Sequence, residues 1–501
     1  MIALLLHLAQ AAPVTGPDAP IPTPELVFQP ILPELALCAA GILGLLYEAF
    51  ARRSNRSVHL GIALAGLVAA GVTASNLWSW TGAPLVLGDA VAVDRFSVVA
   101  TIVLVLVAAF GCVYAWHESG RAEAVYRGEF FPLLLFATAG MTLIVAANDL
   151  IVVFLALEIL SLSLYVLTGM GGRRSSEAAM KYFLLGAFSS AFFLYGVAMA
   201  YGATTSTKIT TIVAALAGQT GSQALALVAM GFLVIGFGFK ISAAPFHMWT
   251  PDVYQGAPTP VVAYMSAATK VAAFFALMRV LDVALQPLTW DWTPIVYALS
   301  VVSVLVGAVL AAAQRDVKRM LAYSAVAHAG FILAGLTSAN TTGIRAAMFY
   351  LIAYSVMTVG AFGVTMLVAT KTEEPSSYDS YDGLAARSPG LAALLTVFLL
   401  SLAGIPPTVG FIAKLTVFGS AIAAGNWPLA LVCVLASVIA AYAYLRVVVR
   451  MYFREPRGEV TDDRAVVPQV AGLVLAVTVV VLGVFPRLLS SIIEQASILR
   501  W

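Results

Sequence analysis

Apolar runs of about twenty residues recur along the whole chain and are separated by short segments that contain charged residues, Gly or Pro. A run of this length suits a helix that crosses a hydrocarbon layer about 30 Å thick. The pattern predicts fourteen such helices. They are expected near residues 31–50, 58–79, 95–116, 130–147, 148–170, 180–202, 225–247, 258–281, 293–312, 319–338, 342–370, 390–422, 427–454 and 465–490. An even number of spans places both ends of the chain on the same side of the membrane.

The composition supports this interpretation. Hydrophobic residues make up 61% of the 501 positions, charged residues only 10%, and the mean hydropathy is +0.95. These values lie far from those of soluble globular proteins, so we expect an all-α integral membrane protein. The net charge of +2 says little about partners, and no basic pattern indicates nucleic acid. Cys38, Cys112 and Cys433 each stand alone in an apolar segment, which argues against a disulfide framework or a four-thiolate iron–sulfur site.

Positive charges are distributed unevenly between the two sets of loops. If the N-terminus lies outside, seventeen of the twenty-seven Lys and Arg residues fall on the inner side and only six on the outer side. The outer six are Arg95, Lys208, Arg279, Arg345, Arg487 and Arg500. Because inner loops usually carry the excess of basic residues, this distribution supports both the number of helices and the placement of both termini outside.

Prolines interrupt two of the predicted helices. In the seventh, Pro245 cannot donate a hydrogen bond to the carbonyl of Ile241. In the twelfth, Pro406 and Pro407 leave two further carbonyls without their helical partners, those of Leu402 and Ala403. We therefore expect both helices to be discontinuous. Free carbonyls at membrane depth are tolerated where they face protein or water, so each break is expected to line a polar cavity.

The spacing of the two breaks predicts an internal repeat. They are five helices apart, and an odd offset makes the two broken helices run in opposite directions, as in inverted repeats. The fourth to eighth helices (130–281) and the ninth to thirteenth (293–454) would then form two inverted five-helix repeats. They would be flanked by the first three helices (31–129) and by the last helix with the C-terminus (465–501), after a leader (1–30) without assigned function. Two unrelated prolines that kink two long helices remain an alternative.

Five titratable residues lie deep within the predicted spans. Glu158 is ten residues into its helix, about 15 Å from the surface at ~1.5 Å per residue. Lys270 and His328 reach a similar depth, and Lys240 and Lys414 lie beside the two breaks. A charge at the bilayer centre costs at least about 2.5–3.5 kcal/mol. These groups therefore need pairing, hydration or a function.

Proton transfer is the function that this row of residues favours. A lysine next to Glu158 would hold its proton while paired and release it when separated, and His328 could pass protons between lysines. Lys181, one to two turns into the sixth helix, could instead extend to the inner surface. A static ion pair at Glu158 and a packing role for His328 remain open. Phosphate-binding and haem-attachment motifs are missing. The spans contain too few polar groups to bind a large polar solute, so the transported species is expected to be a proton or a small cation.

Long motifs surround these positions. The longest is FKISAAPFHMWTPDVYQGAPTPVVAYMSAATKVAAF, and LEILSLSLYVLTG, SEAAMKYFLLGAFSS, VKRMLAYSAVAHAGF and LAGIPPTVGFIAK accompany it. Together they resemble the antiporter-like membrane subunits of respiratory complex I, and their form is most similar to the N-type member. The L-type member has a long lateral helix after its core, and the M-type member has a glutamate at the position of Lys414.

The resemblance implies residue roles, cofactors and partners. The proton-transfer residues would be Glu158, Lys181, Lys240, Lys270, His328 and Lys414. The chain itself would hold no cofactor and no metal, while NADH, FMN, iron–sulfur clusters and quinone would bind partner subunits. Expected partners are a neighbouring antiporter-like M-type subunit, small K-, J-, A- and H-type membrane subunits and the lipid bilayer. The expected location is the bacterial plasma membrane, with both termini on the periplasmic side.

Two other functions remain possible from the sequence. The same helices and charges would serve a subunit of a cation/proton antiporter, or of a related membrane-bound hydrogenase, that does not oxidise NADH. The chain could also be a structural spacer in the membrane with inert ion pairs. The favoured function is proton translocation in an NADH:quinone oxidoreductase.

Overall fold

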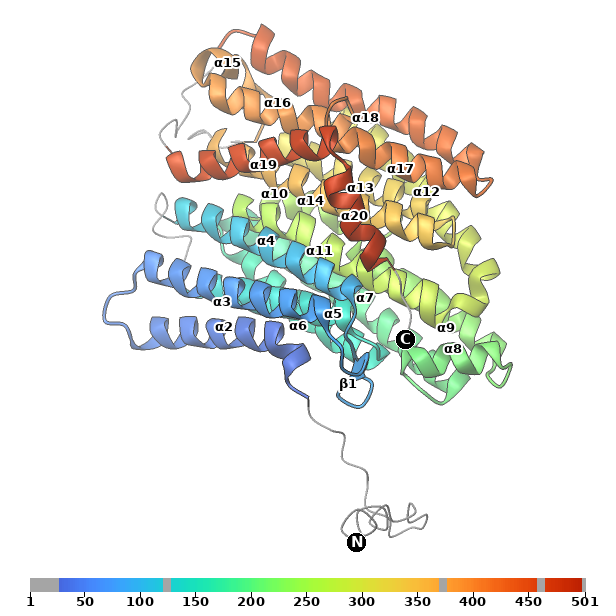
Figure 1. The fold of residues 1–501 in the computed structure, drawn as a ribbon. Helices are drawn as coiled ribbons and strands as arrows, with labels where there is room; N and C mark the ends of the chain where they lie inside the picture. The colour runs from blue at the N-terminus through green and yellow to red at the C-terminus, as the bar shows by residue number, and fades with distance from the viewer. Residues whose placement is uncertain (1–26, 120–127, 369–375, 457–464, 498–501) are drawn as a thin grey trace.

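Long helices that lie side by side form most of the chain in a computed structural model (Figure 1). The structure describes residues 27–119, 128–368, 376–456 and 465–497, so nearly all of the predicted leader lies outside the described residues. In this part of the chain, twelve helices are long and apolar enough to cross a membrane, and three shorter apolar helices accompany them. The prediction of an all-α membrane protein is confirmed.

Most predicted spans correspond to one observed helix. The long helices are α2 (Leu32–Phe50), α3 (Arg56–Asn76), α4 (Arg95–Glu118), α5 (Phe130–Ala146), α6 (Leu150–Gly169), α7 (Arg173–Thr204), α9 (Gln223–Lys240), α11 (Thr259–Arg279), α12 (Thr289–Ala313), α13 (Val317–Leu336), α14 (Thr341–Val368), α16 (Pro389–Ala403), α17 (Val409–Ala423), α18 (Trp427–Phe453) and α19 (Val466–Val484). The short ones are α8 (Ile209–Ala217), α10 (Trp249–Gly256), α15 (Leu384–Arg387), α20 (Arg487–Ala496), a π-helical turn η3 (Val280–Ala284) and the 3-10 turns η1 (Gln29–Ile31), η2 (Leu77–Ser79), η4 (Gln286–Leu288) and η5 (Tyr378–Tyr381).

Acidic side chains fix where several of these helices begin. Asp94 accepts a hydrogen bond from the backbone N–H of Ser97 at the start of α4, and Asp149 and Asp316 cap α6 and α13 in the same way. An N-cap carboxylate pairs with an N–H group that has no partner within the helix. The polar residues between apolar runs are therefore the signals that divide the chain into spans.

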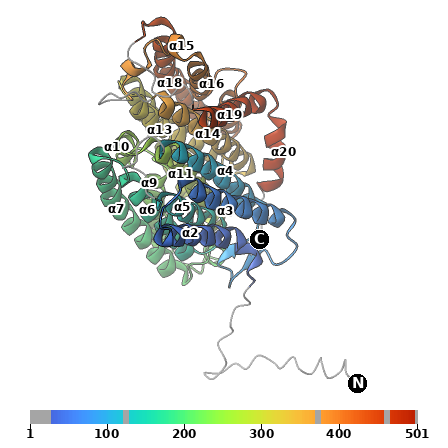
Figure 2. The same ribbon diagram turned by 90° about the vertical axis from the view of Figure 1, so that its left-hand side faces the viewer.

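Three helices form the interior of the bundle. In α11 every residue from Pro260 to Arg279 is buried, and α13 and α14 are buried over nearly their whole length. Figures 1 and 2 show the remaining helices packed around them. The outer helices expose aliphatic side chains, among them Leu155 on α6, Leu184 on α7 and Val438 on α18. This pattern is that of a protein whose outer surface faces lipid.

Several short elements at one end of the bundle were not predicted from the sequence (Figure 1). A two-stranded antiparallel hairpin, β1 (Leu85–Val86) and β2 (Val91–Ala92), precedes α4, and α8 follows α7. The expected span 465–490 is also wrong in its extent, because α19 ends at Val484 and α20 starts after Pro486. These elements are too short to produce a periodic pattern, and Pro486 has no N–H with which to continue α19.

Both predicted helix breaks coincide with interruptions in the structure. α9 ends at Lys240 and α10 starts at Trp249, with Pro245 between them. The seventh span was predicted to continue to residue 247, and the structure ends it seven residues earlier. α16 ends at Ala403 and α17 starts at Val409, with Pro406 and Pro407 between them.

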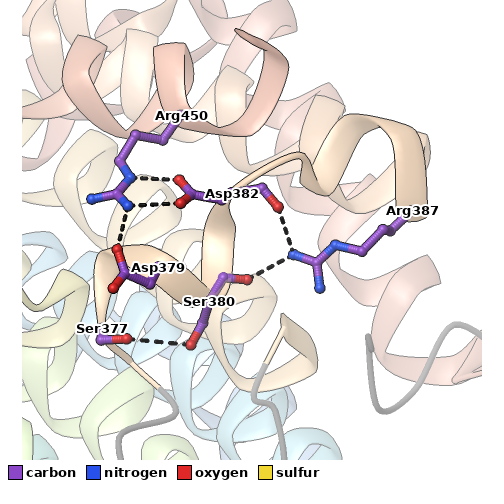
Figure 3. A network of polar contacts seen from close by, with 6 residues as sticks. All are labelled: Ser377, Asp379, Ser380, Asp382, Arg387 and Arg450. Carbon is purple, nitrogen blue, oxygen red and sulfur yellow. Dashed lines mark hydrogen bonds and ion pairs between the residues drawn. The ribbon is translucent and has the colours of Figure 1, made fainter. Parts of the chain in front are cut away.

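A charged network joins the segment that contains η5 and α15 to α18 (Figure 3). The Arg450 guanidinium on α18 donates two hydrogen bonds to the Asp382 carboxylate, at 2.6 and 2.8 Å, and also binds Asp379. Arg387 donates to the carbonyl oxygens of Ser380 and Asp382 at 2.8 and 3.0 Å. Paired guanidinium–carboxylate contacts set orientation as well as distance. The network therefore holds the start of α16 in place.

A buried ion pair joins α4 to the end of α11. Arg279 is 1% exposed, and its guanidinium donates to both carboxylate oxygens of Asp94 at 2.9 and 3.2 Å. It also donates to the carbonyl of Val145 on α5 at 2.9 Å. Arg279 was expected in the outer loops, and the structure instead shows a buried side chain that connects three helices.

Candidate functional site

Lys240 is the last residue of α9 and is buried beside the first break. Its ammonium donates a hydrogen bond to the Ser161 hydroxyl on α6 at 2.6 Å and lies over the rings of Tyr165 and Tyr182, each 5.7 Å away. Glu158, three residues before Ser161, interacts with it electrostatically. The surroundings of the lysine thus include a neutral hydrogen-bond acceptor, several aromatic faces and one carboxylate.

Lys270 lies in the middle of α11 and is fully buried. Its ammonium donates to the carbonyl oxygen of Ile241 at 2.5 Å. This is the carbonyl that Pro245 leaves without a helical partner. The last carbonyls of a helix carry partial negative charge and attract cations. The ammonium therefore takes the place of the N–H group that the proline lacks.

Lys414 on α17 repeats this arrangement at the second break. Its ammonium donates to the carbonyl oxygen of Ala403, the last residue of α16, at 2.8 Å and to the Ser437 hydroxyl at 2.7 Å. Pro407 leaves the Ala403 carbonyl free. Gly404 has a φ of +84°, and a Cβ atom there would lie 2.8 Å from the lysine's Cδ. A glycine is thus needed where the chain turns against Lys414.

His328 on α13 lies between three buried tyrosines. Its Nδ1 atom and the Tyr350 hydroxyl share a hydrogen bond of 2.7 Å, and its Nε2 atom lies 3.3 Å from the Tyr444 hydroxyl. The ring of Tyr354 is 5.2 Å away between centroids. His328 also interacts electrostatically with Lys270 and with Lys414. It therefore lies close enough to the two lysines that bind the break carbonyls for their charges to act on it.

Glu158 on α6 is half-buried and accepts a hydrogen bond from the Ser190 hydroxyl on α7. Within the described residues it forms no ion pair with any lysine. The static ion pair considered from the sequence is thus not present in this structure. Glu158 lies at the edge of the row of lysines and partly faces outward.

Lys181 lies apart from the other candidates. Because α7 starts at Arg173, seven residues before the predicted boundary, Lys181 is eight residues into the helix. Its exposed ammonium binds Glu177 at 2.8 Å and Asp252 on α10 at 3.1 Å. Asp252 also accepts from Arg319 on α13 at 2.6 Å. Lys181 therefore belongs to a surface network that connects α7, α10 and α13.

The stability that this surface network contributes should depend on pH. Burial disfavours the Asp252 carboxylate, but hydrogen bonds from Arg319 and Lys181 outweigh it and lower the pKa of Asp252 below its ordinary value of 3.8. The two pairs therefore stabilise the folded protein above about pH 4 and lose this effect as the pH falls through the lowered pKa. We expect Asp252→Asn to lower the thermal unfolding temperature at pH 7 by an amount equivalent to about 1 kcal/mol or less.

Thermal unfolding of the purified protein in detergent between pH 3 and pH 7 tests this expectation. The difference between wild type and Asp252→Asn should shrink below pH 4. Glu177→Gln is the matched control, since Glu177 is more exposed and binds only Lys181 among the described residues. A difference that is the same at pH 3 and pH 7 contradicts the assignment.

Five residues of the site were not predicted from the sequence. They are the hydroxyl partners Ser161, Ser190, Ser437, Tyr350 and Tyr444. Ser161 gave a usable signal, because it follows Glu158 by three positions and so shares its helix face. The tyrosines gave none, since a tyrosine within a span is equally suited to packing. Within the described residues, no group of three or more His, Cys, Asp or Glu side chains gathers as metal ligands would.

Known proteins resemble this chain over nearly its whole length. The family described as NADH:quinone oxidoreductase/Mrp antiporter, TM, matches residues 147–440. The NADH-quinone oxidoreductase subunit N of Rhodococcus opacus is 43% identical over 97% of this chain and 98% of its own length. The chain belongs to this subunit N family. The subunit N of Mycobacterium bovis is 41% identical over 95% of this chain and 99% of its own length. The resemblance inferred from the motifs is confirmed.

Two solved structures share the fold of this subunit N family member. A chain of respiratory complex I from Thermus thermophilus has a TM-score of 0.78 at 33% identity and covers 92% of this chain and 98% of its own. A chain of the Mrp complex from Dietzia sp. has a TM-score of 0.81 at 22% identity, with 94% and 96% covered. At 22% identity the second comparison shows a common fold only.

Proposed function

We propose that the chain translocates protons across the membrane as a subunit of an NADH-quinone oxidoreductase, driven by electron transfer in other subunits. One observation carries the proposal: three buried lysines, Lys240, Lys270 and Lys414, donate only to neutral oxygens among the described residues. A lysine tightly paired with a buried carboxylate would leave an uncompensated charge on losing its proton. A lysine held by hydroxyls and carbonyls can lose its proton without that cost.

The proton would follow the row of buried groups. It would enter from the inner side near Lys240, pass through Lys270 and His328 to Lys414, and leave on the outer side. Glu158 would control the first step, because its charge acts on Lys240. The tyrosine hydroxyls bonded to His328 would complete the connection between the two breaks. Lys181 would act at the inner surface and not within the row.

The membrane topology is part of the proposal. The twelve long helices, α5 and the pair α16–α17 would make fourteen crossings, with both termini on the periplasmic side of a bacterial plasma membrane. The interrupted helices would run in opposite directions, as expected for two inverted repeats over 130–281 and 293–454. The similar contacts of Lys270 and Lys414 with the two breaks support this symmetry.

NADH, FMN, iron–sulfur clusters and quinone would bind other subunits of the assembly. This chain would contact a neighbouring antiporter-like M-type subunit, small K-, J-, A- and H-type subunits and lipid. Its aliphatic outer surface supports contacts of this kind.

Proton transport measured against NADH oxidation tests the proposed function. In sealed vesicles that contain the whole assembly, Lys240→Ala and Glu158→Gln should each transport at least fivefold fewer protons per NADH oxidised. Lys208→Ala is the matched control, since this exposed lysine binds Asp89 outside the row. Unchanged transport in both variants would overturn the proposal.

A cation/proton antiporter without NADH oxidation is the second candidate, since the matching family includes Mrp antiporters. Purification distinguishes the two. Flavin and iron–sulfur subunits that co-purify with the chain support the first function, whereas transport without an electron donor supports the second. The third alternative, a spacer with inert ion pairs, has little support, because the described part of the chain contains no ion pair within the row.

A further inference from the structure

A buried serine outside the row is hydrogen-bonded to His328 through a tyrosine. Ser324 lies about one turn before His328 on α13, and its hydroxyl shares a hydrogen bond with the Tyr444 hydroxyl on α18. The Tyr444 oxygen lies 3.3 Å from Nε2 of His328, and Nδ1 of the same ring shares a hydrogen bond of 2.7 Å with the Tyr350 hydroxyl on α14. All four side chains are buried. They form one continuous series of hydrogen bonds across three helices.

The direction of the Ser324 hydrogen bond and the tautomer of His328 depend on each other. The Tyr444 hydroxyl has one proton and can donate it to only one of its two partners. If it donates to Ser324, its oxygen can accept from Nε2–H of the histidine, and Nδ1 then accepts from Tyr350. If it donates to Nε2 instead, the serine must donate to Tyr444 and the ring proton lies on Nδ1. These two arrangements are the two tautomers of a neutral histidine.

The distances favour the first arrangement. Hydrogen bonds donated by hydroxyls are most often about 2.7–2.8 Å long, and those donated by N–H groups are most often about 2.9–3.0 Å long. The contact of 2.7 Å at Nδ1 of His328 therefore indicates that the Tyr350 hydroxyl donates. The longer contact of 3.3 Å at Nε2 indicates a ring N–H that donates to the Tyr444 oxygen. Tyr444 then donates its own proton to Ser324.

Packing keeps the ring of His328 in its orientation. The ring of Phe331 lies edge-on to it at 5.7 Å between centroids, and the ring of Tyr354 lies 5.2 Å away. Both aromatic side chains are buried, so the imidazole has little room to turn over and exchange its nitrogens. The tautomer, and not a rotation of the ring, therefore decides which nitrogen can bind the next proton.

We propose that Ser324 is a positioning residue for proton transfer, which keeps the proton of neutral His328 on Nε2 and leaves Nδ1 open. The next proton then forms an N–H bond at Nδ1, on the side of Tyr350. The ring becomes a cation and is neutral again when one N–H bond breaks and its proton moves on, and no electron is transferred. The inference rests on the proposed function, in which His328 passes protons toward Lys414.

Removing the serine hydroxyl should reverse the tautomer. In Ser324→Ala, the only acceptor left for the Tyr444 hydroxyl among the described residues is Nε2 of His328. A buried hydroxyl without an acceptor is unfavourable, so Tyr444 should donate to Nε2 and the ring proton should move to Nδ1. The open nitrogen would then face Tyr444 and not Tyr350.

Solid-state NMR of the whole assembly with labelled histidine nitrogens tests this change, because protonated and unprotonated imidazole nitrogens differ in chemical shift. His328→Gln identifies the relevant signals, since these should disappear in that variant. We expect the proton on Nε2 in the wild type, on Nδ1 in Ser324→Ala, and again on Nε2 in Ser324→Thr, which keeps a hydroxyl. Ser355→Ala is the matched control, because this buried serine donates to the Leu351 carbonyl at 2.8 Å and should leave the His328 signals unchanged.

Transport in vesicles that contain the same assemblies decides whether the tautomer matters. Protons transported per NADH should fall at least threefold in Ser324→Ala and return to the wild-type value in Ser324→Thr. The same tautomer in wild type and Ser324→Ala, or a reversed tautomer with unchanged transport, overturns the proposal. A loss of transport that Ser324→Thr shares would indicate a packing effect and would also overturn it.

Lys240→Ala, measured in the same vesicles, tests the proposed function separately. If this variant loses transport, the proposed function stands whatever the serine variants show. If it keeps transport, the proposed function fails and the role of Ser324 in proton transfer fails with it.

Discussion

Replacing Lys414 by methionine is expected to reduce NADH-driven proton transport at least tenfold. Methionine has a similar length and no proton to transfer, so the path from His328 would end before the second break. The Ala403 carbonyl would lose its ammonium partner, and an unpaired buried carbonyl costs about 1–3 kcal/mol. The variant should therefore be somewhat less stable but still folded.

Lys414→Arg separates charge from proton transfer. Arginine keeps the positive charge beside the Ala403 carbonyl, but it does not lose its proton in proteins. If Lys414 serves proton transfer, the arginine variant should fold and assemble normally and still transport at least tenfold fewer protons per NADH. If charge alone matters, the arginine variant should transport like the wild type.

Vesicles that contain the assembled enzyme allow both variants to be compared with wild type. Proton uptake and NADH oxidation should be recorded in the same sample, together with the amount of assembled complex. Lys208→Met and Lys208→Arg serve as controls at an exposed lysine. Full transport by Lys414→Met would remove this residue from the pathway.

The second large effect concerns stability. Arg279→Met should lower the free energy of unfolding by about 3–5 kcal/mol, because it leaves the Asp94 carboxylate, which is only 11% exposed, without its cationic partner. The contact of Arg279 with the Val145 carbonyl is lost at the same time. Since these contacts join α4, α5 and α11, the loss should affect the whole first half of the bundle.

A double substitution identifies the cause. Arg279→Met combined with Asp94→Asn removes both charges and should recover a large part of the lost stability, because no buried charge remains unpaired. Denaturant unfolding in detergent of wild type, both single variants and the double variant gives the coupling energy directly. A loss below about 1 kcal/mol in Arg279→Met would show that the pair behaves like an exposed one.

The sequence predicted the spans because membrane helices need long apolar runs, and Asp94, Asp149 and Asp316 mark where such runs start. It did not predict the hairpin or α8, because elements of two to nine residues contain too little periodicity. Pro245, Pro406 and Pro407 indicated the two interruptions, although the structure ends α9 earlier than the proline alone suggested.

The row of buried groups was predictable in its members but not in its contacts. A charged lysine within a membrane costs too much free energy to have no partner or function. The positions of Lys240, Lys270 and Lys414 were therefore enough to predict them as site residues. Their acceptors are two serine hydroxyls and two carbonyls, which depend on how distant helices pack. Lys181 is a different case. Its place near the start of a predicted span left open that it extends to the inner surface, only the resemblance put it among the proton-transfer residues, and the structure shows it exposed beside Glu177 and Asp252.

The carbonyl acceptors at the two breaks have a consequence for genetics. Every amino acid carries the same carbonyl group, so an alanine scan through Ile241 and Ala403 would leave both acceptors in place and pass over them. The residues that control these oxygens lie four positions later. Pro407→Ala would supply an N–H that competes with Lys414 for the Ala403 carbonyl. The proline at position 407 therefore keeps this carbonyl available to the lysine.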